Sequence, residues 1–270
     1  MDKIPLDILD KIESVQNKQL KELDLTSEAN GYELNKIPDR IFDLEFLESL
    51  DLKFNSIQEI PNQISNLKNL KSLNLAYNQL TKLPESIGEL TKLNHLNLGS
   101  NNLTSLPESI DKLINLKQLH LGGNKLATLP ESIINLTGLT ELDLDGNAFT
   151  NLPELIGNMS NLTQLNLGDN KLETLPESIG KLANLKELYL GGNKLSSLPE
   201  SIGDLTGLTK LILIYNQLTS LPESIGKLAN LRELYLRDNK IESLPRSIAE
   251  LSNLNQLDLK FNPISNVKKA

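Results

Sequence analysis

The chain has 270 residues, no cysteine, no tryptophan and a formal net charge of −8. Without cysteine it has no disulfides, no thiolate metal site and no thiol nucleophile, and a reducing compartment is favoured. The acidic balance argues against nucleic acid and anionic membranes as partners, because both bind through basic stripes.

Residues 5–19 predict an amphipathic helix. Ile8, Ile12 and Val15 fall on one face, and Pro5 stands near the start. We expect residues 1–22 to form an N-terminal helical cap. The segment has no uninterrupted apolar run and shows no signal peptide, so a cytoplasmic location is expected. A secreted bacterial protein whose signal peptide has been removed stays open as the alternative.

After this helix the chain repeats every 23 residues. Proline recurs at this spacing from Pro38 to Pro245. Asparagine recurs in ten positions, and we predict that these form a structural ladder that satisfies backbone groups at each bend: Asn55, Asn78, Asn101, Asn124, Asn147, Asn170, Asn193, Asn216, Asn239 and Asn262. Ten coincidences in each of two columns establish a repeat protein.

Each part of the repeat predicts a piece of structure. The Leu-x-Leu step, as in Leu188 and Leu190, has the period of a strand, and the proline excludes the next stretch from an interior sheet. Ile202 and Leu205, three residues apart, return inward from a short helical turn. Stacking buries leucines that no single repeat could bury. The predicted fold is an α/β solenoid, a right-handed superhelix or horseshoe with a parallel concave sheet and short helical or extended turns on the convex side.

The array has irregular ends. A four-residue surplus within residues 26–32 displaces the asparagine of the first repeat. We expect residues 23–264 to form about eleven repeats, residues 265–270 to be a C-terminal tail, and the whole to be a single domain. Because the tail is short beside the edge strand it follows, a homodimer through this end is a further expectation.

Most repeats carry a glutamate directly after the proline, as at Glu85, Glu177 and Glu223. We expect each carboxylate to interact with the amino end of its own helical turn and to be otherwise solvated.

The solvent-facing strand positions can be read as columns counted back from the asparagines. Three adjacent repeats carry large apolar or aromatic side chains in the central column, where most others are polar. The predicted partner-binding residues are Tyr189, Ile212, Ile214, Tyr215, Tyr235 and Arg237. The alternative is that Tyr–Ile–Tyr packing across strands only stabilises the sheet. Glycines at 99, 122, 168 and 191 could let a partner's backbone approach, or reflect drift of the repeat.

The residues give no support for catalysis. The two histidines, His95 and His120, lie on neighbouring strands with an offset that predicts a separation of about 8 Å, too large to share an ion comfortably. No glycine-rich phosphate loop follows a strand and opens a helix. We therefore expect no enzyme activity, no catalytic residue, no metal and no cofactor.

The repeats from about Leu20 to Ile264 resemble the 23-residue leucine-rich repeats with the Leu-Pro-x-x-Ile-Gly signature. Residues 83–88 and 221–226 carry it in full. The class includes many bacterial proteins, plant intracellular Ras-group proteins and the repeat domain of Roco proteins. The resemblance implies the horseshoe fold. Roco proteins follow their repeats with a P-loop GTPase, and this chain has no Walker A sequence.

Two functions follow as expectations. The first is a non-enzymatic scaffold that binds a protein partner on the concave face, with signalling as a context. The second is the repeat arm of a larger regulator, such as a Roco-like GTPase regulator, that makes intramolecular or dimer contacts.

Overall fold

The computed structural model describes residues 4–264. Contacts divide the chain into two compact units, Met1–Leu139 and Thr140–Ala270, which we call the N-terminal and C-terminal units and describe separately. The expected tail, residues 265–270, lies outside the described residues. Among residues 4–264 no helix is both long and apolar enough to cross a bilayer.

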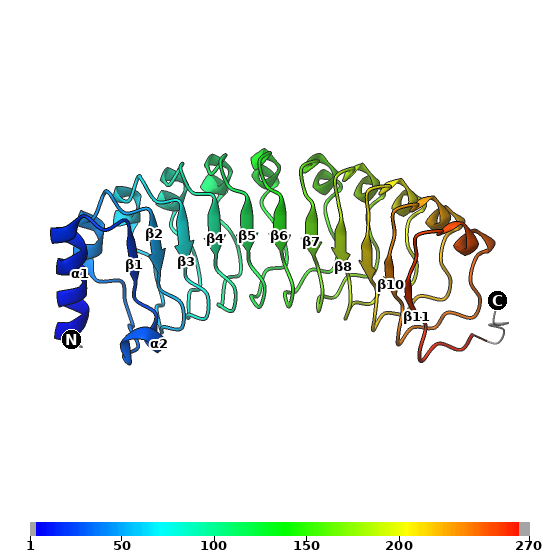
Figure 1. Ribbon diagram of the computed structural model, residues 1–270, viewed down its shortest axis with the longest axis horizontal. Coiled ribbons are helices and arrows are strands. Elements are labelled where there is room, and N and C mark those ends of the chain that lie inside the picture. Colours follow the sequence, from blue (N-terminus) through cyan, green and yellow to red (C-terminus); the bar gives the residue numbers. More distant parts are fainter. Residues whose placement is uncertain (1–3, 265–270) are drawn as a thin grey trace. The chain divides into compact units, whose positions relative to one another are not determined.

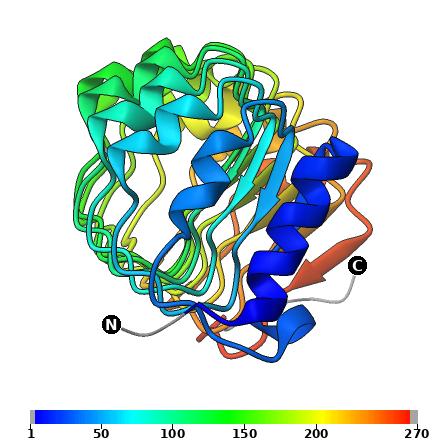
Figure 2. The same ribbon diagram turned by 90° about the vertical axis from the view of Figure 1, so that its left-hand side faces the viewer.

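The N-terminal unit opens with helix α1, Leu6–Lys18. Ile8, Ile12 and Val15 are its buried residues, and Asp7 in the first turn meets the positive end of the helix dipole. Figure 2 shows α1 in front, across the end of the first repeats. The helix falls within the 1–22 cap expected from the sequence.

The surplus residues of the first repeat form a helix of their own. Strand β1, Glu22–Asp24, is followed by α2, Ser27–Asn30. The Thr26 side chain caps α2 by accepting a hydrogen bond from the backbone N–H of Ala29 at 3.3 Å. The surplus residues therefore form an ordered helical insertion in the first coil. Here a coil means one turn of the solenoid, which is 23 residues long in the regular repeats.

Strands run parallel and in sequence order within each unit (Figure 1). Leucine lies beside leucine in the register, as in Leu50↔Leu73 and Leu188↔Leu211. The N-terminal unit holds β1, β2 (Ser49–Asp51), β3 (Ser72–Asn74), β4 (His95–Asn97) and β5 (Gln118–His120). The C-terminal unit holds β6 (Glu141–Asp143), β7 (Gln164–Asn166), β8 (Glu187–Tyr189), β9 (Lys210–Ile212), β10 (Glu233–Tyr235) and β11 (Gln256–Asp258).

The return path of each coil contains a short 3-10 helix that begins directly after the repeated proline. Proline suits this place because it fixes φ near the helical value and has no N–H to leave unbonded. The N-terminal unit contains η1 (Asp39–Asp43), η2 (Asn62–Asn66), η3 (Glu85–Glu89), η4 (Glu108–Lys112) and η5 (Glu131–Asn135). The C-terminal unit contains η6 (Glu154–Asn158), η7 (Glu177–Lys181), η8 (Glu200–Asp204), η9 (Glu223–Lys227) and η10 (Arg246–Glu250).

The core of each unit lies between its strands and its 3-10 helices. In the coil that contains β8, four core side chains are each 0% exposed: Leu188, Leu190, Ile202 and Leu205. Phe149, in the coil that contains β6, is also 0% exposed and takes the place that Leu195 has in the coil of β8. Each coil thus completes its burial with the leucines of its neighbours. The predicted solenoid of parallel strands and helical turns is confirmed.

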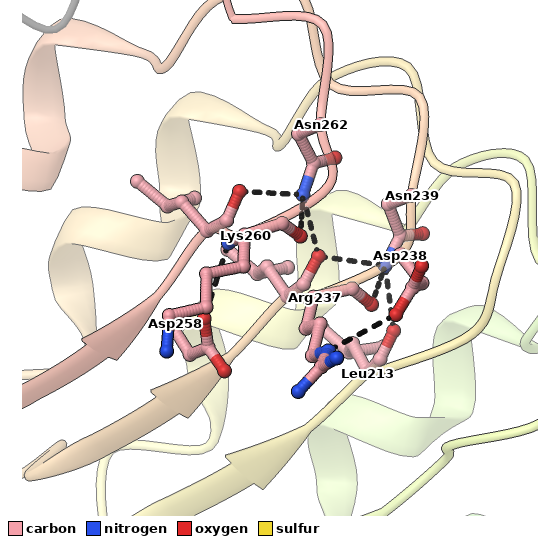
Figure 3. A network of polar contacts seen from close by, with 9 residues as sticks. Leu213, Arg237, Asp238, Asn239, Asp258, Lys260 and Asn262 are labelled. Carbon is pink, nitrogen blue, oxygen red and sulfur yellow. Dashed lines mark hydrogen bonds and ion pairs between the residues drawn. The ribbon is translucent and has the colours of Figure 1, made fainter.

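The repeated asparagines bond to backbone on both sides of each bend. The Asn193 amide donates to the carbonyls of Leu167 and Leu190 at 2.9 and 3.1 Å, and its Oδ1 accepts from Leu172 N at 2.9 Å. Nine of the ten are buried, with exposures of 4–8%. Asn262, in the last coil, makes the same donations but is half-exposed (Figure 3). The amide therefore joins consecutive coils at a point where backbone groups would otherwise be unsatisfied.

The glutamates after proline lie in the first turn of their own 3-10 helices, as expected, but they are not otherwise merely solvated, because they also join coils. Glu177 Oε2 accepts from the backbone N–H of Ser201, in the helical turn of the following coil, at 3.2 Å. Glu85 does the same to Ser109. A carboxylate in the first turn of one 3-10 helix can reach across to the next, because stacking places the two turns side by side.

Candidate functional site

The last residue of most strands has a role in the bend. Asp143 and Asn166 accept hydrogen bonds on Oδ1 from the backbone N–H two residues later, both at 3.1 Å. Asn97 makes the same bond to Gly99 N at 3.0 Å, and Asp258 to Lys260 N at 3.1 Å (Figure 3). An Asx side chain at the strand end is therefore what the fold uses to start its turn.

Three neighbouring strands of the C-terminal unit lack this Asx residue. Tyr189, Ile212 and Tyr235 occupy the position in β8, β9 and β10, and they lie side by side in the register. Isoleucine has no acceptor, and both tyrosine hydroxyls donate to glutamates on their own strands, Glu187 and Glu233. The bend thus loses its usual acceptor in three consecutive coils.

Tyr189 is held in place by its surroundings. Burial and the hydrogen bond to Glu187 raise the pKa of Tyr189 to about 12. Its hydroxyl is therefore protonated at neutral pH and donates to Glu187. Tyr235 is held similarly: its hydroxyl donates to Glu233 at 3.2 Å, and Lys210 Nζ lies 5.9 Å from its ring centre.

The residue before each repeated asparagine takes a left-handed backbone conformation. Three of the ten are Gly123, Gly146 and Gly192, which adopt positive φ at no steric cost. Tyr215 has φ 54° at the same place, and its side chain is 55% exposed. A bulky residue with positive φ is an outlier, and an exposed ring contributes little to the core. Phe54, Tyr77 and Phe261 occupy the same place in other coils, so an aromatic side chain recurs at this bend, and Tyr215 presents its exposed ring there.

Tyr189, Ile212 and Tyr215 meet at a hollow on the sheet of the C-terminal unit. The hollow has a volume of ≈ 360 Å³. We call it the sheet hollow, and it is lined by Asp145, Asn166, Gly168, Asp169, Tyr189, Gly191, Gly192, Ile212, Ile214 and Tyr215.

Glycines form the floor of the sheet hollow. A methyl group on Gly191 would lie 2.9 Å from Cγ1 of Ile214, and one on Gly168 would overlap the Asp145 carboxylate. These glycines therefore let Asp145 and Ile214, which line the hollow, pack directly against the backbone of a neighbouring coil.

Four of the six residues predicted to bind a partner line the sheet hollow: Tyr189, Ile212, Ile214 and Tyr215. Tyr235 adjoins it through its pairing with Ile212. Arg237 points elsewhere, since its Nε pairs with Asp238 at 3.1 Å and its guanidinium lies 4.7 Å from the Phe261 ring centre. Tyr189, Ile212, Ile214 and Tyr235 are half-buried and only Tyr215 is exposed, because neighbouring coils cover part of each side chain.

The sequence reading missed Asp145 and Asp169. Both lie beyond the strand, two and one residues before a repeated asparagine. Extending the solvent-facing columns into the bend would have shown an aspartate at each. Burial and the charges of Asp143 and Asp169 raise the pKa of Asp145.

The histidines lie closer than the sequence reading predicted. The ring centres of His95 and His120 are 5.4 Å apart, because the side chains lean together across the strands. His95 Nδ1 is 2.7 Å from Gln118 Oε1. Within residues 4–264 no group of three or more His, Cys, Asp or Glu side chains could hold a metal ion.

Comparison with known proteins identifies the repeat. The family described as "Leucine-rich repeat region" matches residues 9–101, 87–173 and 165–257. A search of curated protein sequences found no match.

Solved structures share the fold. The ectodomain of the Arabidopsis thaliana receptor kinase GASSHO1/SCHENGEN3, in complex with CASPARIAN STRIP INTEGRITY FACTOR 2, has 31% identity and a TM-score of 0.74, over 90% of this chain and 36% of that one. The plant peptide hormone receptor RGFR1, in complex with RGF2, has 34% identity and a TM-score of 0.73, over 91% and 44%. A Leptospira interrogans leucine-rich-repeat protein has 26% identity and a TM-score of 0.52, over 98% and 95%.

The chain thus spans less than half of either plant receptor chain and nearly all of the Leptospira chain. The family matches follow one another along residues 9–257, and they coincide with the coils of the structure. The chain belongs to the leucine-rich-repeat proteins.

Proposed function

We propose that the chain is a non-catalytic binding protein that holds an extended segment of a protein partner on the solvent-facing side of the C-terminal sheet. The anchors are Tyr189, Ile212, Ile214 and Tyr215, with Tyr235 beside them. Two of the structural relatives are receptors solved in complex with a hormone or factor, which supports binding as the general role.

The observation that carries the proposal is that side chains which differ from the usual residue of the repeat lie together on one part of the sheet. Tyr189, Ile212 and Tyr235 replace the Asx residue in three adjacent strands, and Tyr189 and Ile212 line one hollow together with Ile214 and Tyr215. Sequences break the local rules of their fold mainly at functional sites. Aromatic side chains with restricted rotamers are also what interfaces use as anchors.

The test is Ile212→Asn, which restores the residue type of β7. The new Oδ1 can accept from Ile214 N as Asn166 accepts from Gly168 N. We expect unchanged or slightly higher thermal stability and a loss of partner affinity on the order of thirtyfold. The assay is affinity for peptides selected from a random 12-residue phage-displayed library on the wild-type chain.

The matched control is the reverse change, Asn97→Ile, in the N-terminal unit. It removes the bond to Gly99 N and should lower stability by about 1 kcal/mol without affecting peptide affinity. If Ile212→Asn instead lowers stability and leaves affinity unchanged, the Tyr–Ile–Tyr row is sheet packing and the proposal is wrong.

A second candidate is a contact through the last described coil, as a homodimer or as the repeat arm of a larger regulator of the Roco type. In this coil Leu257 is 41% exposed and Phe261 is 66% exposed, whereas Leu188 and Leu234 at the position of Leu257 are fully buried. Sedimentation of the wild type and of Leu257→Asp tests the homodimer. A monomer in both would rule it out.

A further inference from the structure

The sheet hollow has two chemically different walls. On one side Tyr189, Ile212, Ile214 and Tyr215 present apolar surface, and on the other Asp145 and Asp169 present carboxylates. No lysine or arginine is among the ten residues that line it. An apolar wall alone would accept any hydrophobic side chain. The chemical class of the partner therefore has to be inferred from the carboxylates.

The carboxylates stand over glycines of the following coil. A methyl group on Gly168 would overlap Asp145, and one on Gly192 would overlap Asp169. The same relation thus occurs twice, in consecutive coils. Glycine at 168 and 192 lets each carboxylate lie against the backbone of the next coil at the wall of the hollow, where Asp169 is exposed and Asp145 is half-buried.

Two cations beside the Tyr–Ile–Tyr row are engaged elsewhere. Lys210 Nζ pairs with Glu233 at 3.0 Å, and Arg237 Nε pairs with Asp238 at 3.1 Å. Neither Asp145 nor Asp169 forms an ion pair with a residue in the part of the chain that the structure describes. Burial and two neighbouring carboxylates raise the pKa of Asp145, which means that the ionised form of this side chain is destabilised in the folded protein. A cation from a partner would relieve that repulsion.

We propose that the sheet hollow binds a lysine or arginine side chain of an extended partner segment, with a neighbouring apolar side chain of that segment against Tyr189, Ile212 and Tyr215. This inference rests on the proposed function and specifies the partner: a basic–apolar peptide. The volume of ≈ 360 Å³ lies at the small end of ligand sites, which suits one or two side chains.

The probe is the same random 12-residue peptide library, selected on the immobilised full chain. We expect enrichment of lysine or arginine within two residues of leucine, isoleucine, phenylalanine or tyrosine. The best peptides are then synthesised with each basic residue kept or replaced by glutamine, and their Kd values are measured by fluorescence anisotropy.

The test variant is Asp145→Asn combined with Asp169→Asn, which keeps shape and removes charge. Basic peptides should bind it about tenfold more weakly, and their glutamine versions should bind it and the wild type equally. The control is Asp111→Asn combined with Asp204→Asn, two aspartates of the 3-10 helices, which changes net charge equally and should leave affinity unaltered. Thermal unfolding checks that both double variants fold.

The outcomes separate this inference from the proposed function. Selected peptides without a basic preference, or basic peptides that lose no more affinity on the test variant than on the control, would overturn the basic–apolar assignment while Ile212→Asn still reduces binding. Peptides indifferent to Ile212→Asn, or a library that yields no binder, would overturn both.

Discussion

At the scale of the residue, Tyr215 offers a way to test the proposed function separately from folding. Glycine would adopt its φ of 54° without penalty, while a side chain there costs on the order of 1 kcal/mol. Tyr77 has the same conformation and nearly the same exposure, 54%, in the N-terminal unit, where it stacks on Phe54 at 4.5 Å. The two tyrosines form a matched pair.

Tyr215→Gly should retain or raise the melting temperature and weaken peptide binding at the sheet hollow at least tenfold. Tyr77→Gly should change stability within about 1 kcal/mol and leave binding intact, because it lies in the other unit. Circular dichroism melts and anisotropy titrations give both quantities. Equal binding by the two variants would remove Tyr215 from the proposed anchors.

The sequence allowed part of this site to be predicted. Tyr189, Ile212 and Tyr235 could be placed in one row by counting back from the asparagines, since strand register follows the repeat. The half-burial of those side chains and the approach of Asp145 to Gly168 could not, because both depend on how the bend folds over the next coil. The contacts of Arg237 with Asp238 and Phe261 could not be predicted either, because they too depend on the bend and the next coil.

At the scale of the element, the 3-10 helices pack more tightly than their length suggests. A methyl group on Gly203 would lie 2.7 Å from Cβ of Ser224 and would overlap the Ser224 carbonyl. The same contact recurs between Gly88 and Ser109 and between Gly157 and Ser178, and both serines are buried like Ser224. Glycine in this signature is therefore a packing residue of the convex side.

Gly203→Ala should destabilise the C-terminal unit by about 1–3 kcal/mol, because η9 must move away from η8. Gly99→Ala is the control, since its nearest contacts, at 3.3 and 3.4 Å, need only small shifts. Urea unfolding of both variants gives the difference. Equal stabilities would show that the coils can spread apart without loss.

The glutamate that joins one 3-10 helix to the next should make stability depend on pH. The nearby Ser247 hydroxyl and its backbone N–H, which donates at 3.2 Å, lower the pKa of Glu223 below its ordinary 4.5. The ionised carboxylate therefore stabilises the fold above pH 4.5, and this contribution disappears as the pH falls through the lowered pKa. Glu223→Gln should lose that increment, measured as the difference in melting temperature between pH 7 and pH 3.

Glu242→Gln is the control for Glu223→Gln, since Glu242 is exposed and in the next coil. It should preserve the dependence on pH of the wild type. An unchanged profile in Glu223→Gln would show that the contact across coils contributes nothing measurable. The sequence could place this glutamate at the start of a turn, but which turn it contacts depends on the stacking, which periodicity alone does not give.

At the scale of the whole molecule, a repeat protein is stabilised by contacts between neighbouring coils. These contacts determine how far the loss of stability caused by one substitution extends along the chain. Asn170 in the C-terminal unit accepts from Phe149 N at 3.0 Å and donates to the carbonyls of Leu144 and Gly168 at 2.9 and 2.8 Å. One side chain thus satisfies backbone of the coil before it as well as its own. Stability in such arrays is a sum of coil and interface terms, so damage should be local.

Asn170→Ala should cost about 1–3 kcal/mol, because buried backbone groups lose their partners. We expect faster amide hydrogen exchange at Phe149 and in the strands β6 to β8, with the rate at Leu234 in β10 unchanged. Asn184→Ala, which removes an exposed bond to Ser160 O, is the control and should leave every rate as in the wild type. A uniform rise across the C-terminal unit would mean that the unit opens as a whole, since only an all-or-none transition gives distant coils the same loss of protection.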